Sequence, residues 1–90
     1  MNVFPTAVEN LLRAFPDVEE FRVTLQKVRQ MDELEIEVEL RAGAESRAQE
    51  VAEPITQRFR MLLGFRPKVE VVAQGTLPRF ELKARRFRKL

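Results

Sequence analysis

The sequence predicts an α+β fold: a ferredoxin-like two-layer sandwich with two helices on one face of an antiparallel sheet of about three strands, followed by a basic C-terminal tail. Two segments carry the apolar spacing of amphipathic helices, and three segments alternate apolar and polar side chains as strands do. Their order is helix, strand, strand, helix, strand. A strand before residue 5 would complete the β-α-β-β-α-β order of the ferredoxin-like fold. A chain of 90 residues with 44% hydrophobic and 33% charged residues is typical of a single domain over residues 1–90.

The first helix is predicted to begin at a capping box and to end before a proline. Thr6 and Glu9 have the three-residue spacing in which a hydroxyl and a carboxylate satisfy the free N–H groups at a helix start. Pro16 ends the helix, because the residue before a proline avoids the helical conformation. The apolar face of this helix consists of Val8, Leu11, Leu12 and Phe15.

Two alternating segments predict an antiparallel hairpin. The first strand is expected over residues 20–28, and the polar residues 29–32 form the turn. In the partner strand, apolar residues alternate with the glutamates Glu33, Glu35, Glu37 and Glu39. These carboxylates share one face, which either binds a cation or faces solvent, with Arg22 and Lys27 offsetting part of the charge. We favour the solvated face, since neighbouring outward side chains of one strand do not converge on a metal.

A second helix and a third strand follow the hairpin. Ser46 and Gln49 form a second capping box, and Gly64 gives this helix a C-terminal stop. Pro54 lies inside the helical pattern and is expected to kink the helix or to split it, because proline removes one backbone hydrogen bond. The apolar stripe consists of Val51, Ala52, Ile55, Phe59, Leu62 and Leu63. Alternation over residues 68–72 predicts the last strand.

The end of the chain combines a shaped loop with concentrated positive charge. Gly75 and Pro78 lie three residues apart, which is typical of a loop and not of a helix or strand interior. Residues 79–90 contain six basic residues and one acidic residue, whereas residues 1–78 contain ten basic and thirteen acidic residues. A cationic loop at the edge of an acidic domain is suited to meet a phosphate or a carboxylate. The alternative is a solvated basic tail without a specific partner.

Composition excludes several classes of function. Cysteine and histidine are absent, which removes disulfides, thiolate metal sites, the commonest general base and any Ser-His or Cys-His nucleophile pair. The three glycines lie far apart, so there is no glycine-rich phosphate loop, and the carboxylates indicate neither a metal site nor an acid/base pair. The predicted acidic sheet face without aromatic residues argues against nucleic acid. The chain contains neither a membrane-spanning apolar run nor a signal-peptide pattern, so we expect no membrane partner and a cytoplasmic location.

Two segments carry motifs of a known family. Residues 2–9 read NVFPTAVE and match the pattern G-x-N-V-F-P-S/T-x-(I/V)-E from its third position onward. Residues 75–86 read GTLPRFELKARR and match G-(T/S)-L-P-R-(S/T/F)-E-G-K-(A/G)-(K/R)-R. Through these motifs, essentially the whole chain resembles the C-terminal domain of the adenylate-forming acyl-CoA ligases, and most closely the phenylacetate-CoA ligase family. Phe80 and Leu82 depart from the frequent Ser/Thr and Gly, which implies a different local loop or another acid substrate.

The resemblance implies a role for three basic residues. Lys83 corresponds to the family lysine that acts when a carboxylate attacks the α-phosphate of ATP, giving acyl-adenylate and pyrophosphate. Arg79 and Arg86 are the implied contacts of a phosphate of ATP or CoA. The domain is then expected to rotate, withdraw the lysine and help to form the path for CoA. The full enzyme would use ATP with Mg²⁺, CoA and a small carboxylic acid of the aryl-acetate kind.

The resemblance also implies a partner, the large N-terminal adenylation domain, which is absent from these 90 residues. The piece alone is therefore expected to be inactive and to bind no cofactor. Loss of an edge strand with the missing part would leave backbone unpaired, which favours a homo-oligomer. A function of a different class is a stand-alone ferredoxin-like interaction or regulatory module, whose basic tail binds an acidic partner or nucleic acid.

Overall fold

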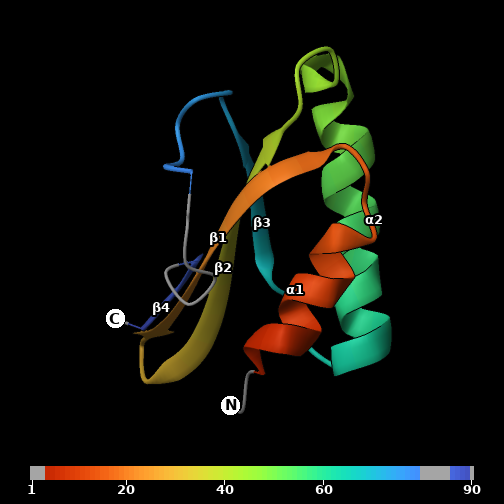
Figure 1. The fold of residues 1–90 in the computed structure, drawn as a ribbon. Coiled ribbons are helices and arrows are strands. Elements are labelled where there is room, and N and C mark those ends of the chain that lie inside the picture. Colours follow the sequence, from red (N-terminus) through yellow and green to blue (C-terminus); the bar gives the residue numbers. More distant parts are fainter. Residues whose placement is uncertain (1–3, 80–85, 90) are drawn as a thin grey trace.

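A computed structural model describes residues 4–79 and 86–89, in which two helices pack on one face of a four-stranded sheet (Figure 1). The helices are α1 (Pro5–Arg13) and α2 (Ala48–Leu63), and a short 3-10 turn (Glu45–Arg47) precedes α2. The strands are β1 (Val18–Val28), β2 (Met31–Leu40), β3 (Lys68–Val72) and β4 (Phe87–Lys89). The predicted two-layer α+β arrangement is confirmed.

The central hairpin of β1 and β2 is antiparallel, as predicted, and its register pairs Val28 with Met31. The turn is shorter than the predicted range 29–32. It contains only Arg29 and Gln30, which both adopt the left-handed conformation, with φ of 52° and 67°. Two consecutive residues with positive φ match the twist of the flanking strands, so β2 can begin directly at Met31.

The sheet is mixed, with the strand order β3-β2-β1-β4. β3 pairs in parallel with β2, because α2 returns the chain over one face of the sheet, and β4 pairs in parallel with β1. The predicted antiparallel sheet of three strands therefore gains a fourth strand and two parallel pairings. The end of the chain is also more than a basic tail, since Phe87 packs edge-to-face on Phe21 with ring centroids 6.2 Å apart.

Neither helix starts at a capping box, so both of those predictions are wrong. Phe4 is the N-cap of α1 and Pro5 its first helical residue, and no side chain caps this end. Proline is favoured there because its fixed φ suits a helix and its missing N–H would have no partner. Arg47 is the N-cap of α2, again without a side-chain cap, because Ser46 belongs to the 3-10 turn.

Pro54 does not split the second helix, which runs without interruption from Ala48 to Leu63 and ends at Gly64 with φ of 77°. Proline at the seventh position of α2 removes only the hydrogen bond to the carbonyl of Glu50. Val51, Ile55 and Phe59 are buried on both sides of it, and their burial outweighs the lost bond.

The core lies between the helices and one face of the sheet. Its buried hydrophobic residues are Val8, Leu11, Leu12, Val18, Phe21, Val23, Leu34, Ile36, Val38, Leu40, Ala44, Val51, Ile55 and Phe59. Each apolar side chain of this size contributes about 1.5–3 kcal/mol when it is fully buried. Within the described ranges, no helix is long and apolar enough to cross a bilayer.

Candidate functional site

Glu39, near the end of β2, holds the loop that follows β3. Its side chain is fully buried and accepts hydrogen bonds from the backbone N–H groups of Gly75 (2.8 Å) and Leu77 (3.1 Å) and from Nη2 of Arg79 (2.6 Å). The Arg79 hydrogen bond first, and the two backbone bonds after it, lower the pKa of the Glu39 carboxyl to about 2, although burial opposes this shift. Glu39 is therefore ionised over the whole neutral range.

The loop itself has the conformation that its composition predicts. Gly75 has φ of 86°, a conformation that side chains disfavour, and Thr76 donates its backbone N–H to the carbonyl of Ala73 at 3.0 Å. Leu77 of this loop is buried. The loop is thus fixed by the carboxylate of Glu39 through the backbone N–H groups of Gly75 and Leu77.

Glu39 also corrects the prediction of a solvated glutamate face. The other three glutamates of β2 are partly exposed, and Glu37 pairs with Arg22 through bonds of 2.8 and 3.1 Å, so the predicted offset by Arg22 is confirmed. The part expected of Lys27 stays a prediction. Among residues 4–79 and 86–89, no group of three or more acidic side chains is placed to hold a metal ion.

A second buried ion pair joins Arg86 to Glu20. Nε and Nη2 of Arg86 donate to the two carboxylate oxygens at 2.6 and 3.3 Å, and the side chains are only 10% and 5% exposed. The guanidinium also lies over the ring of Phe21, 5.4 Å from its centroid. The hydrogen bond to Glu20 is the main cause that raises the pKa of Arg86. Arg86 is therefore held in one orientation by a fork of hydrogen bonds and by an aromatic face.

The two ion pairs are neighbours in the sheet. Glu20 and Glu39 are register partners across β1 and β2, directly after a register shift between Val18 and Glu20. Arg79 and Arg86 stand immediately before and after residues 80–85 in the sequence. We call the pairs Glu39–Arg79 and Glu20–Arg86 together the double anchor.

The structure accounts differently for the three residues predicted to carry function. Lys83 lies outside the described residues, as do Phe80 and Leu82. Arg79 and Arg86 are both described, and both bind carboxylates of this domain. The side chain of Arg79 is 52% exposed and also lies 3.5 Å from Glu19. The predicted phosphate contacts of Arg79 and Arg86 are not tested by these observations.

Arg88 on β4 is another basic residue that contacts the neighbouring strands of the sheet. Its Nε donates to the hydroxyl of Thr24 at 2.7 Å, and its Nη2 lies 3.9 Å from a carboxylate oxygen of Glu37. The cationic end of the chain thus meets the acidic strands of its own sheet. The sequence does not show that these two segments meet, and their opposite charges are the one signal in it that points to the contact.

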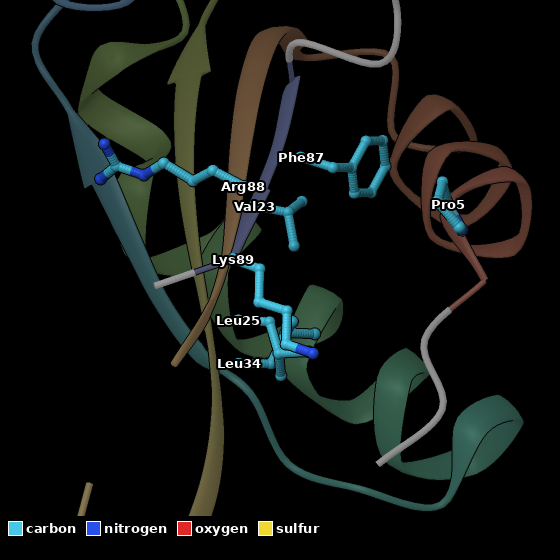
Figure 2. Close-up of a pocket in the computed structure, with 7 residues that line it drawn as sticks. All are labelled: Pro5, Val23, Leu25, Leu34, Phe87, Arg88 and Lys89. Atoms are coloured by element: carbon cyan, nitrogen blue, oxygen red, sulfur yellow. The ribbon is translucent and has the colours of Figure 1, made fainter. Parts of the chain in front are cut away.

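A small apolar hollow lies between the start of α1 and β4. Its volume is about 170 Å³, and its lining residues are Pro5, Val23, Leu25, Leu34, Phe87, Arg88 and Lys89. Figure 2 shows the apolar side chains turned toward this space, the Lys89 side chain beside Leu25 and Leu34, and Arg88 extended away from it. Among the described residues, five of the lining side chains are apolar, two are cationic and none is a carboxylate, so the hollow is suited to apolar contact.

Together these features define a small α+β domain whose basic C-terminal loop is fixed to its sheet by charge. The chain belongs to the AMP-binding enzyme C-terminal domain family, whose model matches residues 1–89. No curated protein matches the chain.

Solved structures that resemble this chain include domains of CoA ligases. A domain of phenylacetate-coenzyme A ligase from Bacteroides vulgatus is 29% identical, with a TM-score of 0.82 over 99% of this chain and 85% of that one. 2-Hydroxyisobutyryl-CoA ligase, in complex with 2-HIB-AMP and CoA in the thioesterification state, is 28% identical with a TM-score of 0.83. That match covers 98% of this chain but only 19% of the ligase. The same ligase in the postadenylation state with 2-HIB-AMP matches at 27% identity, over 96% of this chain and 19% of that one, with a TM-score of 0.79.

Proposed function

We propose that this chain is the mobile C-terminal domain of an AMP-forming acyl-CoA ligase of the phenylacetate-CoA ligase kind. The observation that carries the proposal is the match to a phenylacetate-coenzyme A ligase domain over 99% of this chain. The similarity to one ligase in both its postadenylation and its thioesterification states supports a domain that serves both half-reactions. Rotation between the two half-reactions is part of the proposal.

In the first half-reaction, a carboxylate oxygen of the acid attacks the α-phosphorus of ATP. An acyl–phosphate bond forms, the bond to pyrophosphate breaks, and acyl-adenylate and pyrophosphate result. Lys83 is proposed to bring its ammonium group between the two anions, where it offsets their repulsion and stabilises the charge on the transferring group. An electrostatic contact of this kind lowers the barrier by roughly 3–4 kcal/mol.

The substrates of the complete ligase are then ATP with Mg²⁺, CoA and a small carboxylic acid of the aryl-acetate kind. The partner domain is the N-terminal adenylation domain, which would supply the acid pocket, and the location is the cytoplasm. Arg79 and Arg86 remain the proposed contacts of a phosphate of ATP or CoA. Of the two, Arg79 is better placed, because half of its side chain is exposed. The 90-residue chain alone is proposed to be inactive and to bind none of these substrates.

The decisive variant is Lys83→Ala in the complete ligase that this domain serves. Pyrophosphate release from ATP and the acid should fall at least about a hundredfold, while thioester formation from supplied acyl-adenylate and CoA should largely survive. Lys68→Ala on β3 is the matched control, since Lys68 is an exposed lysine on another edge of the sheet. Equal loss in both half-reactions, or in neither, would refute the role of Lys83.

The alternative, a stand-alone module that binds an acidic partner through its basic end, gains no support from the described residues. Arg79 and Arg86 are already bound to carboxylates of this domain, and Arg88 is bound to Thr24. Self-association through the edge of β3 remains a separate proposal, because no described strand pairs with its outer side. Sedimentation over a range of concentrations would test it, and a monomer throughout would count against it.

A further inference from the structure

We infer that Glu39 and Glu20 are positioning residues for acyl-adenylate formation, because they fix the two ends of the segment that contains Lys83. This inference rests on the proposed function of Lys83. It assigns the two glutamates a task in the adenylation half-reaction that neither the fold nor the family motif demands.

Glu39 fixes the entry to the segment. Both of its oxygens are used, one by Gly75 and Arg79 and the other by Leu77, and the carboxylate is fully buried. Only an ionised carboxylate offers acceptors to all three donors at once. A neutral amide of the same shape would turn its NH₂ group toward one of them, so the loop would have to move.

Glu20 fixes the exit. Its two oxygens receive the forked guanidinium of Arg86, and Oε1 also accepts the backbone N–H of Phe21 at 3.1 Å. The ring of Phe21 lies against one face of that guanidinium and limits its rotation. The hydrogen bonds to Glu20 and the contact with the Phe21 ring together leave the side chain of Arg86 little freedom.

The hairpin holds the two carboxylates of these contacts side by side. Register partners in an antiparallel pair have Cα atoms about 4.5–5.5 Å apart, and β1 and β2 form the two central strands of the sheet. Six residues lie between Arg79 and Arg86. One ion pair thus holds the residue directly before residues 80–85 on the sheet and another holds the residue directly after them, which is the support that a group delivered to a reacting centre requires.

Stability alone does not call for this arrangement. A buried ion pair is often no more stabilising than well-packed apolar residues of similar volume, because two charges must be taken out of water. Two such pairs side by side flank one segment. We explain them by the need to hold that segment in one defined orientation. A displacement of about 1 Å at a reacting centre can slow a reaction roughly a hundredfold.

The test measures both half-reactions of the complete ligase with Glu39→Gln and Glu20→Gln. Each variant should slow pyrophosphate release about ten- to a hundredfold and leave thioester formation from supplied acyl-adenylate and CoA within about twofold of the unchanged enzyme. Glu35→Gln is the matched control, because Glu35 lies on the same strand as Glu39 and accepts a hydrogen bond from Gln26 of β1 instead of from the end of the chain. Circular dichroism and thermal unfolding verify that each variant is folded.

Lys83→Ala in the same assay separates the two claims. If Lys83→Ala selectively abolishes adenylation while both glutamine variants, folded, keep it or lose both half-reactions equally, the positioning role is overturned and the proposed function stands. If Lys83→Ala leaves adenylation intact, the proposed function fails and the inference with it. Should the glutamine variants not fold, Gly75→Ala replaces them. An added Cβ meets no atom within 4 Å there and only disfavours the positive φ of the loop, so the same selective loss is expected.

Discussion

Glu20 and Glu39 face each other in register across β1 and β2, and each binds one arginine from the C-terminal end of the chain. The contact of Glu39 with Arg79 is 2.6 Å long, and so is that of Glu20 with Arg86. Two like charges side by side in a sheet would repel each other. The arginines neutralise them, so the sheet and the basic end of the chain depend on one another.

The first prediction concerns the stability of the Glu20–Arg86 pair. Arg86→Met leaves Glu20 buried without its partner and should lower the free energy of unfolding of the 90-residue chain by about 3–5 kcal/mol. The double variant Arg86→Met with Glu20→Leu should recover much of that loss, since it removes both charges. Urea unfolding measures the three values. A double variant as unstable as the single one would show that the ion pair is not the source of the loss.

The second prediction is a pH dependence that belongs to Glu39. Its pKa is about 2 in the folded chain against an ordinary value of 4.5, so the unfolded chain takes up this proton first. The stabilisation is complete above about pH 4.5 and is lost as the pH falls toward 2. Unfolding free energies from pH 6 to pH 2 should therefore decline less steeply in Glu39→Gln than in the unchanged chain. Parallel curves for the two proteins would contradict the assigned pKa.

The third prediction concerns the proline inside α2. Pro54 is exposed, so replacing it by alanine loses little packing and restores a hydrogen-bond donor for the carbonyl of Glu50. Pro54→Ala should raise the free energy of unfolding by about 1–3 kcal/mol. Chemical denaturation checks the sign. A less stable variant would mean that the helix needs the proline ring for a contact or a bend.

The fourth prediction concerns the turn between β1 and β2. Arg29 and Gln30 both hold a positive φ, which costs energy for side chains of this kind. Replacing the pair by Asn-Gly, the sequence that such a turn prefers, should stabilise the chain by about 0.5–1 kcal/mol. A thermal melt should show the gain as a higher midpoint. An unchanged or lower midpoint would indicate that the arginine or the glutamine makes a compensating contact.

Much of the fold could be predicted from the spacing of apolar residues, because the burial of one face of each helix and strand imposes that spacing. The alternation of the hairpin and most of the buried face of each helix follow from the residues that must be inside. Leu62 is an exception, because the spacing predicts it on the apolar stripe of α2 and it is 60% exposed. β4 could not be found this way, since its three residues are too few to show a period. Pro54 shows the limit of a local rule: the loss of one hydrogen bond predicts a kink or a break, but the burial of a whole helical stripe keeps α2 continuous.

The candidate site could be predicted only in part. The motif drew attention to Arg79 and Arg86, but not to their carboxylate partners. In the sequence Glu39 is one of four equivalent glutamates, and only the passage of the Gly75 loop over the end of β2 makes it different. Glu20 follows another glutamate, and the register shift beside it decides which of the two pairs with Arg86. Tertiary contacts determine which glutamate binds each arginine, and the alternation of apolar and polar residues does not reveal these contacts.

The most direct measurement for the account is the ratio of two rates in the complete ligase carrying Lys83→Ala, namely acyl-adenylate formation and thioester formation from supplied acyl-adenylate. The proposed function predicts that this ratio falls at least about a hundredfold, because only the first reaction needs the ammonium group. A ratio equal to that of the unchanged enzyme would contradict it.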